Sequence, residues 1–152
     1  MKIIRTNAGN PDFVELVKHL DAELAVRDGE DHAFYAQFNQ IAPIKYAVVA
    51  YENGQASGCG AIREFDAGTM EVKRMYVLPE HRGKGFATNI LAELEQWAAE
   101  LSCKRCVLET GKNQPEAIAL YDKNGYSRIP NYGQYEGVEN SVCFEKRLPY
   151  LP

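Results

Sequence analysis

One stretch of the chain combines residue types that suit the binding of an anion. Between residues 75 and 88, an apolar run ends at Pro79, a basic and glycine-rich turn follows, and a long amphipathic pattern begins. A strand, a glycine turn and a helix start together present free backbone N–H groups to an anion, with the helix dipole behind them. Arg82 and Lys84 add side-chain charge at the same place. The sequence therefore predicts that this turn binds a phosphorylated ligand.

Two common phosphate-binding motifs do not match the turn. A P-loop requires glycine at position 78 and serine or threonine after Lys84, but the chain has Leu78 and Gly85 there. A dinucleotide fingerprint requires a third glycine at position 88, where the chain has threonine. The turn keeps an Arg-x-x-Gly-x-Ala pattern that begins at Arg82, at a junction between a strand and a helix.

The elements around this turn alternate in a way that indicates the fold class. Hairpins dominate the first half of the pattern, and strand-helix-strand crossovers dominate the second. We expect an α+β fold with a mixed sheet and helices on both faces. The expected strands cover residues 2–6, 46–51, 56–64, 69–78, 105–110, 126–129 and 141–146, and the expected helices cover 11–27, 32–40, 87–101 and 114–123.

The overall composition fits one globular domain over residues 1–152. Hydrophobic residues make up 45% of the chain and charged residues 25%, which is ordinary for a soluble protein. The net charge of −4, from 17 Lys and Arg against 21 Asp and Glu, argues against a partner such as nucleic acid or an anionic membrane. A small cationic substrate is compatible with this charge.

The N-terminus and the cysteines indicate a cytoplasmic protein without a metal site. Residues 1–5 contain no apolar signal core, and no apolar run approaches the roughly 20 residues needed to span a bilayer. The four cysteines, at positions 59, 103, 106 and 143, are expected as reduced thiols. Cys103 and Cys106 form a C-x-x-C pair, but no second Cys or His pair follows at zinc spacing.

The pattern that begins at Arg82 resembles the Arg/Gln-x-x-Gly-x-Gly/Ala signature of the GCN5-related N-acetyltransferase (GNAT) superfamily, which binds the pyrophosphate of acetyl-coenzyme A (acetyl-CoA). The run 70–85 is similar to the family's central strand and loop, and the runs 108–111 and 117–126 resemble its second motif. Ala87 stands where many members carry glycine, and the signature permits either. The resemblance covers essentially the whole chain, and it implies a GNAT-type, mostly antiparallel central sheet.

The resemblance implies acetyl-CoA as cosubstrate and a set of residues that contact it. Met75, Tyr76 and Val77 would pair through their main chain with the pantetheine arm, and a backbone N–H there would polarise the thioester carbonyl. Asn113 resembles a polar residue that often contacts the cofactor, and Lys123 has either this role or that of a solvated helix lysine. The residues that the resemblance places around the pyrophosphate lie in the turn and at the start of the helix: Arg82, Gly83, Lys84, Gly85, Phe86, Ala87 and Thr88.

The resemblance also implies two catalytic roles. Tyr121 matches the tyrosine that protonates the leaving sulfur in many members, although it also reads as a core aromatic residue. The ordinary pKa of a tyrosine, near 10, lies within about two units of a thiol's roughly 8.5. Glu71 resembles a general base of the histone-modifying branch, with Glu109 as the alternate. The other interpretation of Glu71 is a structural pair with Lys73 or with a cross-strand partner. A carboxylate requires a raised pKa, or a bridging water, to deprotonate an ammonium near 10.4.

These residues together predict an N-acetyltransferase that acts on a primary amine of a small molecule by direct transfer. A non-catalytic acyl-CoA-binding regulatory module, or an acetyltransferase of a protein or peptide amine, remains the alternative. No motif names the acceptor. The residues Phe34, Tyr35 and Phe38 either cap the core or wall an acceptor pocket, and His81 is a ligand contact or a solvated residue. The loop with Tyr132, Tyr135, Glu136 and Glu139 recognises a cation, stays solvated, or contacts a second copy in a homodimer.

Overall fold

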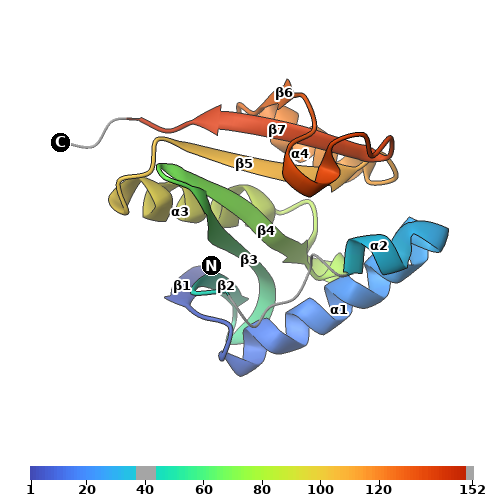
Figure 1. Cartoon of the computed structure of the whole chain (residues 1–152). Coiled ribbons are helices and arrows are strands. Elements are labelled where there is room, and N and C mark those ends of the chain that lie inside the picture. Colours follow the sequence, from blue (N-terminus) through green and yellow to red (C-terminus); the bar gives the residue numbers. More distant parts are fainter. Residues whose placement is uncertain (37–43, 150–152) are drawn as a thin grey trace.

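Strand β4 (Thr69–Val77) leads into the predicted ligand turn and lies in the interior of a mixed sheet. The computed structural model describes residues 1–36 and 44–149. Over these residues the sheet has seven strands in the order β1-β2-β3-β4-β5-β7-β6 (Figure 1). Neighbouring strands are antiparallel except β4 and β5, which are parallel. The other strands are β1 Lys2–Thr6, β2 Tyr46–Glu52, β3 Gln55–Asp66, β5 Arg105–Gly111, β6 Ser127–Ile129 and β7 Ser141–Arg147.

Helices cover both faces of the sheet, and each face has its own buried cluster. Helix α1 (Pro11–Asp28) packs Phe13 and Leu16 against β2 and β3 on one face. Helices α3 (Phe86–Glu100) and α4 (Pro115–Lys123) pack on the other face around residues such as Leu94 and Tyr121. The short helix α2 (His32–Ala36) follows α1 (Figure 1). The predicted α+β class, with a mostly antiparallel sheet flanked on both faces, is confirmed.

Local sequence signals explain where several elements begin and end. The side chain of Asn10 accepts hydrogen bonds from the backbone N–H groups of Asp12 (2.9 Å) and Phe13 (3.1 Å), which caps α1 as its sequence predicts. Asn53 and Gly54 have φ of 52° and 80°, as the tight turn between β2 and β3 requires.

The second predicted helix, over residues 32–40, is seen as α2 up to Ala36. Phe38, in the later part of this predicted helix, lies outside the described residues. No helix within residues 1–36 and 44–149 is both long enough and apolar enough to cross a membrane.

The two glycines of β3 mark a close approach of helix α3 rather than of a ligand. A Cβ atom at Gly60 would lie 2.9 Å from side-chain atoms of Ile90 and of Leu94. A Cβ at Gly58 would lie 3.0 Å from the side chain of Ile90. Such distances are too short for ordinary packing, so the helix sits against the strand only because both side chains are missing.

Strand β4 contains a bulge in its middle. Ala61 on β3 faces Lys73, whereas Cys59 faces Tyr76, so β4 carries one extra residue between these pairs. Arg74 lies at this bulge with a φ of 58°, which is unusual for a residue with a side chain. The bulge bends the second half of β4 and changes the direction of its side chains on the way to the glycine turn.

Candidate active site

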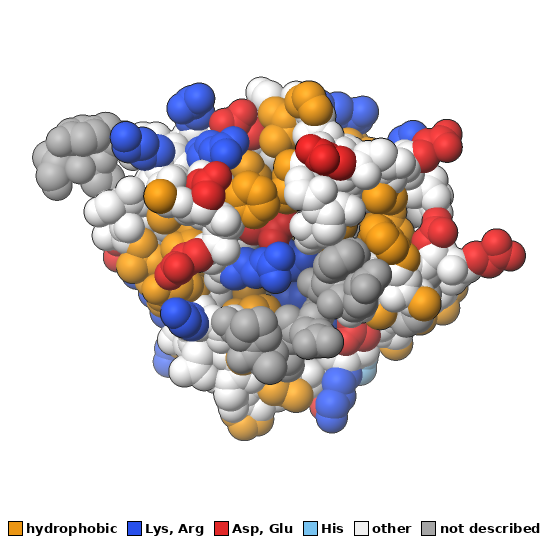
Figure 2. Space-filling view, viewed as in Figure 1, with side chains coloured by type: hydrophobic (Ala, Val, Ile, Leu, Met, Phe, Trp, Pro, Cys, Tyr) orange, Lys and Arg blue, Asp and Glu red, His pale blue; other side chains and the backbone are white. Residues whose placement is uncertain are grey.

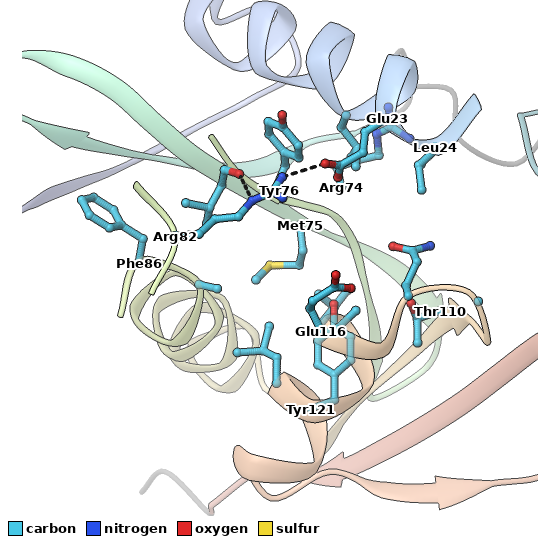
Figure 3. Close-up of a pocket in the computed structure, with 18 of the residues that line it drawn as sticks. Glu23, Leu24, Arg74, Met75, Tyr76, Arg82, Phe86, Thr110, Glu116 and Tyr121 are labelled. Atoms are coloured by element: carbon cyan, nitrogen blue, oxygen red, sulfur yellow. Dashed lines mark hydrogen bonds and ion pairs between the residues drawn. The ribbon is translucent and has the colours of Figure 1, made fainter. Parts of the chain in front are cut away.

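The parallel strands β4 and β5 separate, and a cavity lies between them. Their pairing begins at Thr69 opposite Arg105 and stops at Glu71 opposite Val107. A cavity of about 570 Å³ occupies the split and is lined by residues of β4, β5, α1, α3 and α4 (Figure 3). In Figure 2, basic and acidic side chains lie beside one another near the middle of the face shown. A cavity of this size suits a small-molecule ligand.

The glycine turn forms part of this cavity and leaves a helix start free. Gly83 and Gly85 have φ of 79° and 87°, a conformation that glycine adopts without strain. Gly85 is the N-cap of α3, and no side chain caps the helix there. The first intrahelical bond runs from the N–H of Asn89 to the Gly85 carbonyl (3.1 Å), so the N–H groups of residues 86–88 precede it. With the helix dipole, these groups form a site suited to phosphate.

Arg82 connects this turn to two other elements. Its Nε donates to the carbonyl oxygen of Val77 at 2.8 Å, and one terminal nitrogen donates to Glu23 of α1 at 3.0 Å. Its guanidinium also lies over the ring of Tyr76, 5.4 Å from the centroid. Figure 3 shows both hydrogen bonds as dashed lines. Arg82 therefore holds the end of β4, the turn and α1 together while it lines the cavity.

The second half of β4 offers its backbone to the cavity. Met75, Tyr76 and Val77 all line it, as the sequence predicts for a strand that contacts a ligand with its main chain. Because the pairing with β5 has already stopped, the backbone groups that point towards β5 have no strand partner there. An extended ligand can bind these groups in the manner of an added strand.

Tyr121 reaches the cavity from helix α4. Its ring packs against Tyr126 and Phe144, with centroids 5.7 and 5.8 Å away, and only 6% of the residue is exposed. Its hydroxyl has no hydrogen-bond partner within the described part of the chain. Burial raises the pKa of Tyr121 above the usual value, so the phenol keeps its proton. In Figure 3 Tyr121 and Met75 project into the same space from opposite walls.

The side chain of Glu71, the predicted base, is held by hydrogen bonds to other side chains of the protein. Its side chain is buried, and its two oxygens accept hydrogen bonds from Nε of Arg63 (2.8 Å) and from the hydroxyl of Tyr132 (2.5 Å). Glu71 is not among the described residues that line the cavity. The loop around Tyr132, considered above as an acceptor contact, therefore packs on β4 through this carboxylate. Tyr135 of the same loop is buried.

Glu109, the alternate base, does line the cavity from β5. The hydroxyl of Ser141 donates to one of its oxygens at 2.6 Å. Burial raises the pKa of Glu109 to about 7, and the negative charges of Glu71 and Asp28 act in the same direction. Ser141 and the ammonium of Lys73 oppose this rise. A carboxylate with such a pKa exchanges a proton at neutral pH, as a general base must.

The cavity thus brings together most of the residues that the sequence singled out. The lining includes Met75, Tyr76, Val77, Arg82, Gly83, Gly85, Phe86, Ala87, Thr88, Tyr121, Lys123, His81 and Tyr35. Lys84 and Asn113 are not among the described lining residues; Lys84 is exposed, and the Asn113 amide donates to the carbonyl of Arg27 at 3.3 Å.

Helix α1 contributes lining residues that sequence reasoning missed. Glu23 binds Arg82, and Arg27 forms a bidentate pair with Glu116 at the start of α4, with distances of 2.8 and 3.2 Å. These two pairs join α1 to both sides of the cavity (Figure 3 labels Glu23, Arg82 and Glu116). The amphipathic pattern of α1 predicted a buried face. The pattern does not predict which distant residues the charged side chains on its other faces contact.

Comparison with known proteins agrees with this geometry. The family model described as "Acetyltransferase (GNAT) family" matches residues 13–126, a range that runs from α1 past α4 and includes β4 and the glycine turn. The chain belongs to this family. Its members are acyltransferases, and the match covers most of the elements that line the cavity.

Individual relatives share the same assignment. The chain is 37% identical over 102 residues to "IAA acetyltransferase" of Azospirillum brasilense, with 66% of this chain and 67% of the relative covered. It is 33% identical over 131 residues to the uncharacterised N-acetyltransferase YjgM of Escherichia coli, with coverage of 79% and 77%.

Solved structures of the GNAT family resemble the whole chain. A Klebsiella pneumoniae protein assigned as an acyl-CoA N-acyltransferase superposes with a TM-score of 0.82 and 32% identity, and 97% of both chains is covered. An Elizabethkingia anophelis GNAT acetyltransferase, solved with acetyl-CoA bound, superposes with a TM-score of 0.68 at 18% identity over 97% of both chains, which shows the shared fold.

Proposed function

We propose that this GNAT acetyltransferase moves an acetyl group from acetyl-CoA to a primary amine of a small molecule by direct transfer. The observation that carries the proposal is the split between β4 and β5. The cavity in this split is lined by an uncapped helix start suited to phosphate and by a strand backbone without a partner. It is also lined by a carboxylate with a pKa of about 7 and by a protonated phenol.

The proposed binding mode of acetyl-CoA follows the order of these features along β4. The pyrophosphate lies on the free N–H groups after Gly85, with Arg82 at its side. The pantetheine arm follows the backbone of residues 75–77, and the thioester reaches the level of the bulge at Arg74. A backbone N–H of this strand then donates to the thioester oxygen, where negative charge develops during attack. The relative solved with acetyl-CoA bound has the same fold, which supports this mode.

Glu109 is the proposed general base. An alkyl ammonium has a pKa near 10.4, so the attacking amine must lose a proton near neutral pH. Glu109 lines the cavity and has a pKa of about 7, and it accepts that proton directly or through one water. Both oxygens of Glu71 are already hydrogen-bonded and the residue lies outside the lining, so the role that the sequence assigned to Glu71 passes to Glu109 in this proposal.

Tyr121 is the proposed general acid. Its hydroxyl faces the cavity and keeps its proton at neutral pH, so a proton is available for the sulfur as the thioester bond breaks. Because burial raises the pKa of Tyr121, the proposed donation depends on the position of the hydroxyl rather than on its acidity. No cysteine belongs to the described lining, and burial raises the pKa of both Cys59 and Cys106 to about 12. These thiols are poor nucleophiles at neutral pH, which supports direct transfer over an acetylated cysteine.

Two linked measurements test the proposal. Calorimetry should detect acetyl-CoA binding, and a thiol-release assay over amines, amino acids, polyamines, aminoglycosides and peptides should detect CoA formation. Tyr121→Phe should lower kcat by about a hundredfold while acetyl-CoA binding persists, because only the proton donor is lost. Tyr46→Phe, on the partly buried β2 position beside Trp97, is the matched control and should leave kcat unchanged. Absence of acetyl-CoA binding, or binding without CoA release for any amine, would overturn the catalytic proposal.

A further inference from the structure

The end of the cavity away from the glycine turn carries opposite charges on its two facing strands. Lys73 lies on β4, four residues before Val77, which is about 13 Å along an extended strand. Glu109 lies on β5, two residues after Val107, the last residue that pairs with β4. Since Glu71 is opposite Val107, the same register continued by two residues brings Glu109 level with Lys73 across the split. Both residues line the cavity.

Neighbouring charges at this end are already paired within the protein. Arg63 donates to Glu71 at 2.8 Å, and Arg74 donates to Asp21 of α1 at 2.5 Å. Each of these four groups thus has an oppositely charged partner. The arginine side chain of position 74 is 1% exposed, and its Nε has no hydrogen-bond partner within the described residues. It adds positive potential next to Lys73 that the single carboxylate of Asp21, which is half exposed, only partly offsets.

Lys73 and Glu109, in contrast, have only hydroxyl partners. The ammonium of Lys73 donates to the hydroxyl of Tyr135 at 3.4 Å and forms no ion pair within residues 1–36 and 44–149. Glu109 accepts one hydrogen bond from Ser141 and forms no ion pair there either. Burial lowers the pKa of Lys73 and raises that of Glu109. The charges of Glu71 and Glu109 oppose the shift of Lys73, and the charge of Lys73 opposes that of Glu109, but neither Lys73 nor Glu109 has a hydrogen-bonded partner of opposite charge within the described residues.

A ligand with one positive and one negative group would give each of these two side chains a hydrogen-bonded partner of opposite charge. An acceptor ammonium next to Glu109 is where the proposed reaction needs it, and Asp28, which also lines the cavity from the end of α1, favours a cation at the same side. A carboxylate next to Lys73 would accept a hydrogen bond from its ammonium and would lie in the positive potential of Arg74. Charge-assisted hydrogen bonds of this kind are roughly twice as strong as neutral ones.

We propose that the acceptor of this enzyme is a zwitterionic amine, an amino acid or a closely related amino carboxylate, whose carboxylate binds Lys73 while its amine faces Glu109. The inference rests on the function proposed above and specifies its substrate class. In this proposal Lys73 determines substrate specificity. The enzyme should prefer amino carboxylates to polyamines and aminoglycosides, which carry amines without a carboxylate.

The test compares pairs of substrates that differ only in the carboxylate. Each pair contains an amino acid and the amine left by its decarboxylation, such as tyrosine and tyramine or lysine and cadaverine, together with β- and γ-amino acids and their alkylamines. We expect kcat/KM to be about ten- to a hundredfold higher for the carboxylate-bearing member of at least one pair, as one charge-assisted hydrogen bond implies. Equal or better turnover of the decarboxylated member in every pair would overturn the inference and leave the acetyltransferase function intact.

Variants then assign the preference to Lys73. Lys73→Met should bring the kcat/KM of the amino acid to the level of its decarboxylated partner, with both substrates measured on the same variant. Lys18→Met, on an exposed position of α1, is the matched control and should leave the ratio unchanged. If Lys73→Met does not fold, Lys73→Gln and Lys73→Arg are compared instead, and arginine should keep the preference that glutamine loses. An unchanged ratio in a folded Lys73→Met protein would contradict the assignment.

Direct binding distinguishes failure of this inference from failure of the function. Amino acids and their decarboxylated amines are titrated into protein saturated with CoA, and the amino acids should bind about ten- to a hundredfold more tightly. If acetyl-CoA binds and amines without a carboxylate are acetylated, but no amino acid binds, the zwitterion inference is wrong and the proposed function stands. If acetyl-CoA itself does not bind, the proposed function fails, and the substrate inference fails with it.

Discussion

Two glutamates on adjacent strands have the same side chain but different surroundings. Glu71 and Glu109 are both largely buried beneath the same part of the sheet, yet Glu71 is satisfied by Arg63 and Tyr132, whereas Glu109 has a single hydroxyl donor. The first carboxylate has a fixed counter-charge and no access to the cavity. The second faces the cavity and titrates near neutrality.

Replacing Glu109 should therefore reduce the rate far more than binding. Glu109→Gln removes the proton acceptor, so we expect kcat to fall by about a hundredfold while the Kd of acetyl-CoA stays within about twofold. In the parent enzyme kcat/KM should rise with pH through about 7, where Glu109 loses its proton, and this limb should vanish in the variant. Steady-state thiol-release assays between pH 5.5 and 9 measure both effects. Glu64→Gln, an exposed glutamate on β3, is the control, and a retained limb at pH 7 would identify another base.

The same carboxylate should make the fold less stable at higher pH. Its folded pKa of about 7 lies above the unfolded value of 4.5, so the folded protein holds a proton that the unfolded chain has lost between these values. Stability contributed by this group is present below pH 4.5 and falls as the pH rises to about 7, by on the order of 3 kcal/mol. Glu109→Gln should thus be more stable than the parent at pH 8 and similar to it at pH 5. Urea unfolding at both pH values measures the difference, and a variant that is less stable at pH 8 contradicts it.

Replacing Glu71 should lower the stability of the fold more than the catalytic rate. Glu71→Gln removes the ion pair with Arg63, whose side chain is 35% exposed and can be partly solvated, so we expect a loss of about 1–2 kcal/mol of folding free energy. The rate of the folded variant at low temperature should stay within about tenfold of the parent, because Glu71 does not reach the cavity. Thermal unfolding and thiol release on the same sample separate the two effects. A stable Glu71→Gln protein without activity would restore the general-base role that the sequence alone assigned to Glu71.

At the level of elements, the glycine turn is the part of the site that the sequence predicts best. A turn needs only local information: Gly83 and Gly85 permit left-handed φ values, and the apolar stripe that follows fixes the start of α3. Asn10 predicts a helix cap and the Asn53–Gly54 pair predicts a hairpin, because caps and tight turns also depend on local sequence. The bulge at Arg74 is different, because no local residue preference requires an arginine in the left-handed conformation.

The turn can be tested with a pair of matched glycine substitutions. Gly85→Ala places a side chain at a φ of 87°, which costs about 1–2 kcal/mol, and it should lower Tm by about 4 °C. It should also raise the Kd of acetyl-CoA about tenfold, because the N–H groups after position 85 shift. Gly68→Ala, with a φ of 86° in the turn between β3 and β4, imposes the same strain away from the cavity. It should lower Tm equally without changing the Kd, and equal effects of both variants on binding would contradict the assigned phosphate site.

Across the whole molecule, the site depends on contacts between residues far apart in sequence, and these are the contacts that the sequence did not reveal. Glu23 and Arg27 of α1 reach Arg82 and Glu116, and Ser141 of β7 binds Glu109. Each of these residues alone resembles an ordinary surface charge or a strand serine. Resemblance to the family predicted the residues of the ligand turn and Tyr121. The proposal of Glu109 rather than Glu71 as the base, in contrast, depends on which side chains pack around each carboxylate.

The separation of β4 and β5 should be visible in hydrogen exchange. Amides of residues 72–77 that point towards β5 have no strand partner, so we expect fast exchange in the free protein and at least about tenfold slower exchange with acetyl-CoA bound. Amides of β3, which pair on both sides, are the internal control. Mass spectrometry of exchanged peptides measures the change. Protection that is already complete in the free protein would contradict the proposed pairing of the strand with its ligand.

The same split gives the sheet two unpaired edges in its interior. Free strand edges at the outside of a protein invite pairing with other chains, but these edges face a cavity walled by α1, α3 and α4. In the proposed binding mode, the acyl carrier of acetyl-CoA adds an eighth strand to the described sheet and pairs with these edges. The protein should then be most stable with acetyl-CoA bound and least stable after its products leave, so its stability should follow the catalytic cycle.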